Sequence, residues 1–126
     1  MAYVLADRTR DTTTTTGTGT VTVSGTAPTT YRTFSVVCAV GDTFPYFIQH
    51  QTADEWEVGI ATYTAANQFT RDTILASSSF GSPDVAVPTP VNFSAGTKDV
   101  VLDVSAAVYQ ADQSENIYPW ANMGGL

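Results

Sequence analysis

The chain has 126 residues and a formal net charge of −7, a length that suits one domain. Only 13% of its residues are charged and only five are basic, so it lacks the basic footprint of a protein that binds nucleic acid or an anionic membrane. Hydrophobic residues make up 43% of the chain, which is enough for a core. The five basic residues are scattered along the sequence: Arg8, Arg10, Arg32, Arg71 and Lys98.

Two further exclusions concern the membrane and the redox state. No apolar run approaches the roughly 18 residues that cross a bilayer, and residues 1–8 lack the basic and apolar regions of a secretory signal. We therefore expect synthesis in a cytoplasm without export. Cys38 is alone, so it forms no internal disulfide or cysteine zinc site and is interpreted as a small buried hydrophobe.

The N-terminal part is dominated by threonine, of which the chain has 21. Residues 9–30 form a Thr-rich tract of low complexity. Within it, Thr20, Thr22 and Ser24 alternate with Val21 and Val23, the period of a half-buried strand. The sequence predicts a strand over 18–24, and turns elsewhere in the tract.

Two segments follow the tract. Tyr31, Phe34, Val37 and Cys38 recur at offsets of three and four, which favours a helical turn, although a strand over 34–40 fits nearly as well. Residues 43–50 read as an aromatic strand.

The clearest strand covers residues 55–63, after a hairpin loop at 51–54. Alternation predicts that Trp56 shares the core face with Val58 and Ile60, while Glu57 and Glu55 lie on a solvated face.

Two later strands, at 69–76 and 99–104, are separated by a loop at 77–90 and a turn around Gly96. The predicted fold class is all-β, a small β-sandwich or barrel of about six or seven short antiparallel strands. We expect one domain over 1–105, the Thr-rich tract included, and an extended C-terminal arm over 106–126.

The C-terminal arm is too apolar for an ordinary solvated tail. We expect it to dock on a neighbouring chain, the alternative being that it folds back on its own domain. The predicted partner contacts lie in the arm and at the N-terminus: Ile117, Tyr118, Trp120, Met123 and Leu126, with Tyr3 and Val4.

Catalytic patterns are weak. His50 could pair with Asp54 across the hairpin, but no G-x-S-x-G motif supplies a nucleophile. Asp99 and Asp103 share a strand face and could hold a cation between subunits, although solvated charge is the simpler interpretation. We therefore predict no enzyme activity, catalytic residue, cofactor or metal.

Several segments in register resemble a module found in virion proteins of tailed bacteriophages. The resemblance spans roughly residues 4–104, whereas residues 106–126 and the long loop at 80–90 depart from it. It is carried by the start at 4–8 with the Thr-Gly tract through Gly19, by Trp-Glu-Val-Gly at 56–59, by the Arg-x-Thr strand at 71–78, and by residues 91–100.

The resemblance implies a non-enzymatic particle component. The first hypothesis is a virion structural protein that attaches to or forms part of a tail appendage, such as a fibre or adaptor. One alternative is a capsid decoration protein, and another is a module that binds host-surface glycans. The expected partners are other virion proteins and further copies of the chain in a homotrimer or other cyclic oligomer, with no nucleic acid and no membrane.

Overall fold

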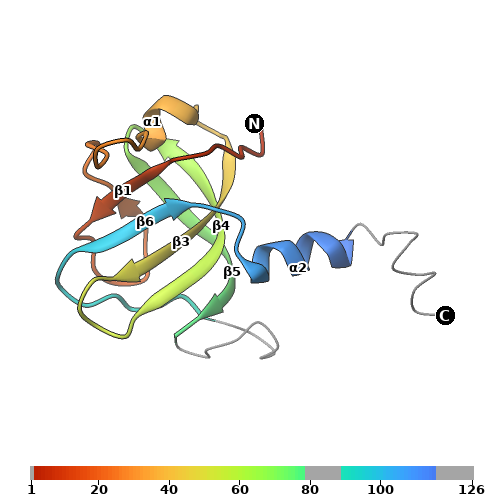
Figure 1. Ribbon diagram of the computed structural model, residues 1–126. Helices are drawn as coiled ribbons and strands as arrows, with labels where there is room; N and C mark the ends of the chain where they lie inside the picture. Colours follow the sequence, from red (N-terminus) through yellow and green to blue (C-terminus); the bar gives the residue numbers. More distant parts are fainter. Residues whose placement is uncertain (1, 79–88, 116–126) are drawn as a thin grey trace.

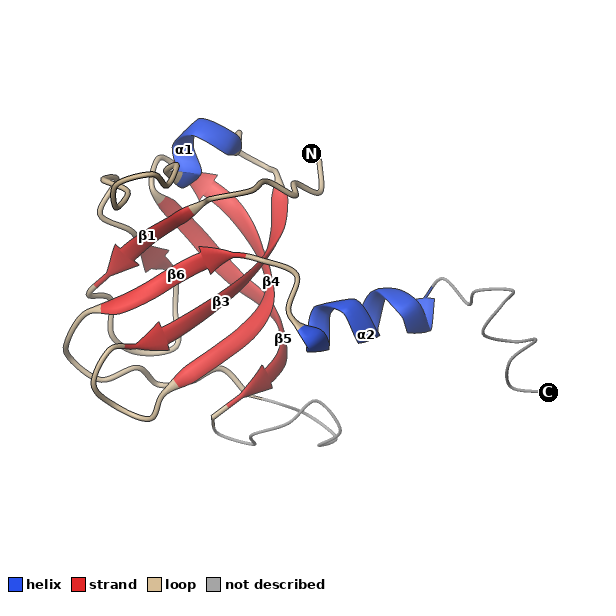
Figure 2. Ribbon diagram, in the orientation of Figure 1, coloured by secondary structure: helices blue, strands red, loops and turns tan. Residues whose placement is uncertain are grey.

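A computed structural model describes residues 2–78 and 89–115 of the chain and shows six strands and two short helices (Figure 1). The strands form one antiparallel sheet that curls into a nearly closed barrel (Figure 2), which confirms the predicted all-β class. The elements are β1 (Arg10–Thr13), β2 (Val21–Thr22), α1 (Phe34–Val37), β3 (Thr43–His50), β4 (Trp56–Ala65), β5 (Gln68–Ser77), β6 (Lys98–Leu102) and α2 (Ala106–Glu115).

The strand order is β1-β6-β3-β4-β5-β2, so the Thr-rich tract supplies both outer strands of the sheet. These two strands meet, because Thr13 and Val23 form an antiparallel bridge and Ser24 N donates to Thr12 O at 2.9 Å. The barrel is closed by a segment that was predicted to be mostly turns.

Aromatic side chains fill the barrel interior. The ring centroid of Phe34 lies 5.2 Å from that of Phe44 and 6.0 Å from that of Phe69, and Tyr46 lies 5.6 Å from Phe69. Phe34 comes from α1, so the helical interpretation of this region is correct. Burial raises the pKa of the nearby Cys38 thiol to about 11, consistent with its interpretation as a small hydrophobe.

The predicted facing of β4 is wrong. Glu57 is 0% exposed and lies inside the barrel, whereas Trp56, Val58 and Ile60 are half-buried on the outer face. The cause is the register with β3: Tyr46 pairs with Gly59 and is too large to face another large side chain. Opposite Phe44 and Tyr46 the interior therefore takes the small residues Ala61 and Gly59, and Glu57 and Tyr63 enter on the same face of β4.

The Thr-rich tract contains a strand that the sequence reading missed. In β1 the inward side chains are polar, so the apolar alternation that marks a strand is absent. Buried Asp11 accepts hydrogen bonds from the hydroxyl of Ser24 and from Gly25 N, the latter at 2.9 Å. The predicted strand over 18–24 is shorter than expected, with Val21 and Val23 buried as the alternation implied.

The first ten residues of the C-terminal arm form α2 and are not extended as predicted. Ala107 and Val108 are buried, and α2 contacts β4 and β5. Figure 1 shows that the helix otherwise points away from the barrel. The arm thus begins by packing on its own domain, while residues 116–126 lie outside the described residues.

Gly59 gives a direct test of the β4 register. A Cβ atom at this position would lie 2.1 Å from the carbonyl oxygen of Thr73 and 3.1 Å from the Tyr46 hydroxyl. We predict that Gly59→Ala lowers the free energy of unfolding by about 3 kcal/mol or more, because backbone must move. Urea unfolding followed by circular dichroism measures this change.

Gly19→Ala is the matched control, since a Cβ atom at Gly19 would meet no heavy atom within 4 Å. It should change the free energy of unfolding by less than about 0.5 kcal/mol. Equal effects of the two substitutions would contradict the register described here.

Candidate functional site

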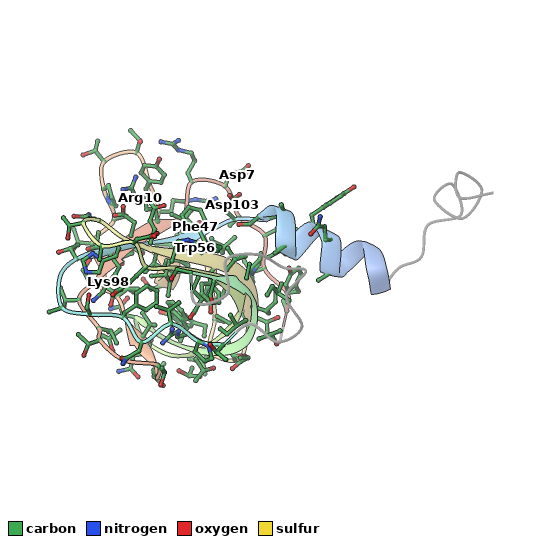
Figure 3. All side chains as sticks on the ribbon, turned by 90° about the horizontal axis from the view of Figure 1, so that it is seen from below. Asp7, Arg10, Phe47, Trp56, Lys98 and Asp103 are labelled. Carbon is green, nitrogen blue, oxygen red and sulfur yellow. The ribbon has the colours of Figure 1, made fainter. Side chains whose placement is uncertain are left out.

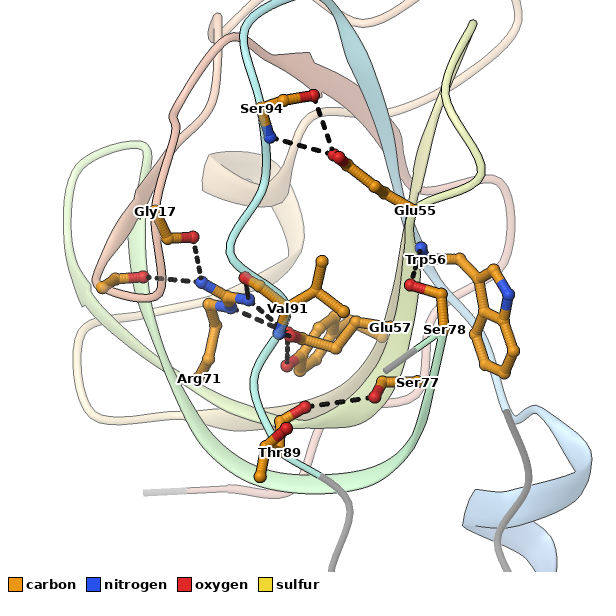
Figure 4. A network of polar contacts seen from close by, with 12 residues as sticks. Gly17, Glu55, Trp56, Glu57, Arg71, Ser77, Ser78, Thr89, Val91 and Ser94 are labelled. Carbon is orange, nitrogen blue, oxygen red and sulfur yellow. Dashed lines mark hydrogen bonds and ion pairs between the residues drawn. The ribbon is translucent and has the colours of Figure 1, made fainter. Parts of the chain in front are cut away.

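The most concentrated group of polar side chains is a buried network around Glu57 (Figure 4). The Glu57 carboxylate accepts hydrogen bonds from Arg71 Nε at 2.7 Å, from Arg71 Nη2, and from the Tyr46 hydroxyl at 2.6 Å. The Arg71 side chain is 1% exposed, so this ion pair is shielded from water. The electrostatic attraction between the two charges is therefore stronger than in a pair at the surface.

The network holds two loops to the barrel. Val91 N donates to Glu57 at 2.9 Å and Val91 O accepts from Arg71 Nη2 at 2.7 Å. Arg71 Nη1 donates to the carbonyl oxygen of Gly17 at 3.0 Å and also contacts that of Gly19. One charged pair thus fixes the segment before β6 and the turn between β1 and β2.

The charges of the network support this structural role. Burial lowers the pKa of Arg71, but the hydrogen bonds and negative charge of Glu57 outweigh it and leave the pKa raised. Burial, followed by the charge of Glu57, raises the pKa of Tyr46, so its hydroxyl remains a hydrogen-bond donor. With its carboxylate accepting four hydrogen bonds, Glu57 acts as a fixed anion in the barrel wall.

His50 has a similar role and does not pair with Asp54. Its Nδ1 accepts hydrogen bonds from Thr52 N and Ala53 N, both at 3.1 Å. Its Nε2 lies 2.8 Å from the carbonyl oxygen of Ala95, an arrangement that the tautomer with hydrogen on Nε2 satisfies. The ring therefore joins the β3–β4 loop to the turn that precedes β6.

The two aspartates considered for a cation site lie in different surroundings. Asp99 is buried, forms an ion pair with Arg10 at 3.1 Å and accepts from Gln51 at 3.1 Å. Asp103 is exposed beyond the end of β6. Among residues 2–78 and 89–115, no group of three potential metal ligands gathers.

The remaining candidate site is the outer surface, where large apolar side chains reach solvent. The predicted contact residue Tyr3 is 44% exposed and forms a parallel bridge to Thr43, whereas Val4 is half-buried against the core. Ile117, Tyr118, Trp120, Met123 and Leu126 lie outside the described residues. Exposed apolar side chains that the sequence reading missed are Leu5, Val36, Val40, Val104 and Tyr109.

Alternation could not identify these residues, because they lie beside the strands rather than within them. Val36 projects from α1, and Val104 lies between β6 and α2. Leu5 and Val104 share the lining of one groove, and Leu5 follows the predicted contacts Tyr3 and Val4 in the chain.

The buried ion pair gives a prediction for stability. Glu57→Gln puts an amide where Arg71 needs an anion and leaves the arginine charge buried and unpaired, which should lower the free energy of unfolding by about 3–5 kcal/mol. Urea unfolding measures the loss, and the double variant Glu57→Met/Arg71→Met should recover part of it. Glu55→Gln, at a half-buried surface carboxylate that contacts Ser94, is the control and should cost less than about 1 kcal/mol. Similar losses for the two single variants would refute the assigned role of Glu57.

The N-terminal segment gives a prediction for pH. Hydrogen bonds from Ala2 N and Ala39 N, both at 2.9 Å, hold the pKa of Asp42 below its ordinary value. Because the pKa is lower in the folded chain, this stabilisation is complete above the ordinary carboxyl pKa and is lost as the pH falls through the lowered value. The protection factors of the amides at residues 2–4, which compare the observed hydrogen-exchange rate with the intrinsic rate at the same pH, should therefore decrease on acidification.

In the variant Asp42→Asn, the protection factors at residues 2–4 should already be lower at neutral pH and should change less on acidification. Asp54→Asn, on the exposed β3–β4 loop, is the control and should behave like the unaltered chain. An unchanged pH response in Asp42→Asn would contradict this role.

Among the described residues, no helix has the length and apolar character needed to cross a membrane. No family model, no curated protein and no solved structure matches this chain.

Proposed function

We propose that the chain is a non-enzymatic structural protein of a tailed-phage particle, which attaches to or forms part of a tail appendage through protein–protein contacts. The observation that carries the proposal is that the buried charged and polar side chains bind other parts of the same chain. Glu57, Arg71 and His50 bind the chain's own loops, and apolar side chains are exposed outside.

The segments that resemble phage virion modules support the same role. Glu57 and Gly59 belong to the Trp-Glu-Val-Gly segment, Arg71 begins the Arg-x-Thr strand, and Val91 begins the later segment. Glu57, Arg71 and Val91 meet in the buried network, and Gly59 lies where β4 leaves no space for a side chain. The residues that carry the resemblance thus belong to the framework of the barrel, which suits a particle component.

The position of α2 supports attachment through the C-terminal end. Val108 fixes the start of the helix on the barrel, and Tyr109 on the next position is exposed. The helix leads away from the barrel toward residues 116–126, whose sequence holds five large apolar side chains. Aromatic anchors such as Tyr118 and Trp120 are typical of protein interfaces.

The proposal is tested by locating the protein on particles. Fab fragments raised against the folded chain should label the tail appendage of particles from the source phage in negative-stain images. Label over the whole shell would favour capsid decoration instead, and particles that contain none of the protein by mass spectrometry would refute the particle role.

A variant at the C-terminal end tests the attachment. The triple variant Ile117→Ser/Tyr118→Ser/Trp120→Ser should reduce incorporation into particles at least about tenfold, because each apolar anchor contributes at an interface. The control Asn116→Ser/Asn122→Ser changes the same segment without removing an apolar side chain and should incorporate normally. Equal incorporation of both variants would exclude this segment as the attachment.

One observation favours a second function, the glycan-binding module. Phe47 and Trp56 both lie on the outer face of neighbouring strands β3 and β4, where aromatic rings could stack on a sugar (Figure 3). Tyr46, the third aromatic of that hypothesis, is buried in the core. Binding of the full chain to a glycan array, lost in Trp56→Ala, would favour this function over the first.

A further inference from the structure

The fold gathers positive charge that is scattered in the sequence. A parallel bridge joins Thr9 to Arg32, in which Arg32 N donates to Arg8 O at 2.5 Å and Arg10 N donates to Arg32 O at 3.1 Å. Three of the five basic residues therefore lie together. The other two, Arg71 and Lys98, have buried side chains.

Two of these three guanidinium groups lack a carboxylate partner. Arg8 stacks on the Tyr31 ring at 4.1 Å and donates to the Thr30 hydroxyl at 2.6 Å. Arg32 donates to the carbonyl oxygen of Asp7 at 2.7 Å. Within the described ranges neither forms an ion pair, whereas Arg10 is paired with Asp99. Arg8 and Arg32 are thus exposed, held in place and available for an anion.

An acidic groove lies next to these arginines. It has a volume of about 180 Å³ and is bounded by the N-terminal segment and by the end of β6. Its lining includes two exposed carboxylates, Asp7 and Asp103, and two exposed apolar side chains, Leu5 at 60% and Val104 at 40%. Figure 3 shows Asp7 and Asp103 beside each other.

The basic pair and the acidic groove share one surface. Asp7 and Arg8 are adjacent in the chain, and the Arg32 guanidinium binds the Asp7 backbone. We call this surface the charged face; its residues are Leu5, Asp7, Arg8, Arg32, Asp103 and Val104.

We propose that the charged face pairs with the same face of a second copy about a two-fold axis. In this arrangement Arg8 and Arg32 of one copy meet Asp7 and Asp103 of the other, and the reverse contacts form at the same time. Leu5 and Val104 supply apolar area between the two sets of charges. The inference goes beyond the proposed function and holds whether or not the chain belongs to a particle.

A second copy is the occupant that the charges favour. A two-fold contact requires that one surface carry both members of each interacting pair, and the charged face does so. A polyanion would be attracted by two arginines but repelled by Asp7, Asp103 and the net charge of −7. An unrelated acidic protein would place no positive charge opposite the two carboxylates of the acidic groove.

Analytical ultracentrifugation of the full chain tests the pairing. We expect a species of twice the 13.4 kDa chain mass. Raising the salt from about 50 mM to about 500 mM should increase its dissociation constant about tenfold, because the contacts are charged and near solvent. A monomer at all concentrations, or a trimer with no salt dependence, would overturn the proposal.

Charge reversal makes the test specific. The variants Arg8→Asp/Arg32→Asp and Asp7→Arg/Asp103→Arg should each be monomeric, since each places like charges across the axis. Mixed in equal amounts, they should form a heterodimer, because both sets of contacts then join opposite charges again, one set with reversed sign and the other as in the unaltered chain. This result also shows that both variants are folded.

Asp54→Arg is the control, since it reverses one charge on the distant β3–β4 loop and should dimerise normally. Failure of the two reversed variants to pair, with circular dichroism of each variant like that of the unaltered chain, would contradict the two-fold arrangement. Loss of dimer in Asp54→Arg would contradict the assignment of the charged face.

Discussion

The buried ion pair between Glu57 and Arg71 is the contact on which the rest of the barrel depends. It joins the neighbouring strands β4 and β5, and its spare hydrogen-bonding groups reach Gly17 on one side and Val91 on the other. Removing either charge would leave the other without water or a counterion. The pair therefore couples the position of two loops to the register of two strands.

This pair also explains the distribution of side chains across β4. A charged side chain inside a small barrel is stable only when an opposite charge and hydrogen bonds compensate its loss of water. Arg71 and Val91 N provide these contacts for Glu57. The same facing sends Trp56 outward and makes the outer wall of the barrel partly apolar. Burying charge inside and exposing aromatic surface outside are thus two results of one register.

The sequence was sufficient for features that depend on local pattern. The strands β3, β4, β5 and β6 and the class of the fold follow from alternation and turn residues, and the helical turn at Phe34 follows from its spacing. Alternation gave the period of β4 but not its phase, because the phase depends on Tyr46 opposite Gly59. The strand β1 was missed because its inward residues Asp11 and Thr13 are polar.

The candidate surface was predictable only in part. Tyr3 could be identified from its position and apolar character, but the charged face joins residues that are more than twenty positions apart. Arg8 and Arg32 meet through a single bridge at Thr9, which no local pattern indicates. The arm at 106–115 was expected to be extended because Pro119 and the glycines that follow weaken a helix, yet the helix at Ala106–Glu115 precedes these residues in the sequence.

The closure of the sheet by β1 and β2 has a consequence for the behaviour of the chain at high concentration. An open sheet edge offers unpaired backbone groups to the edge of another molecule and so promotes polymerisation. Here both edges come from one stretch of about fifteen residues, and each is capped by the other through Thr13 and Val23. The Thr-rich tract therefore acts as the chain's own protection against strand exchange. A chain that lost this tract would leave both β5 and β6 as unpaired edge strands, and each could pair with a strand of another molecule.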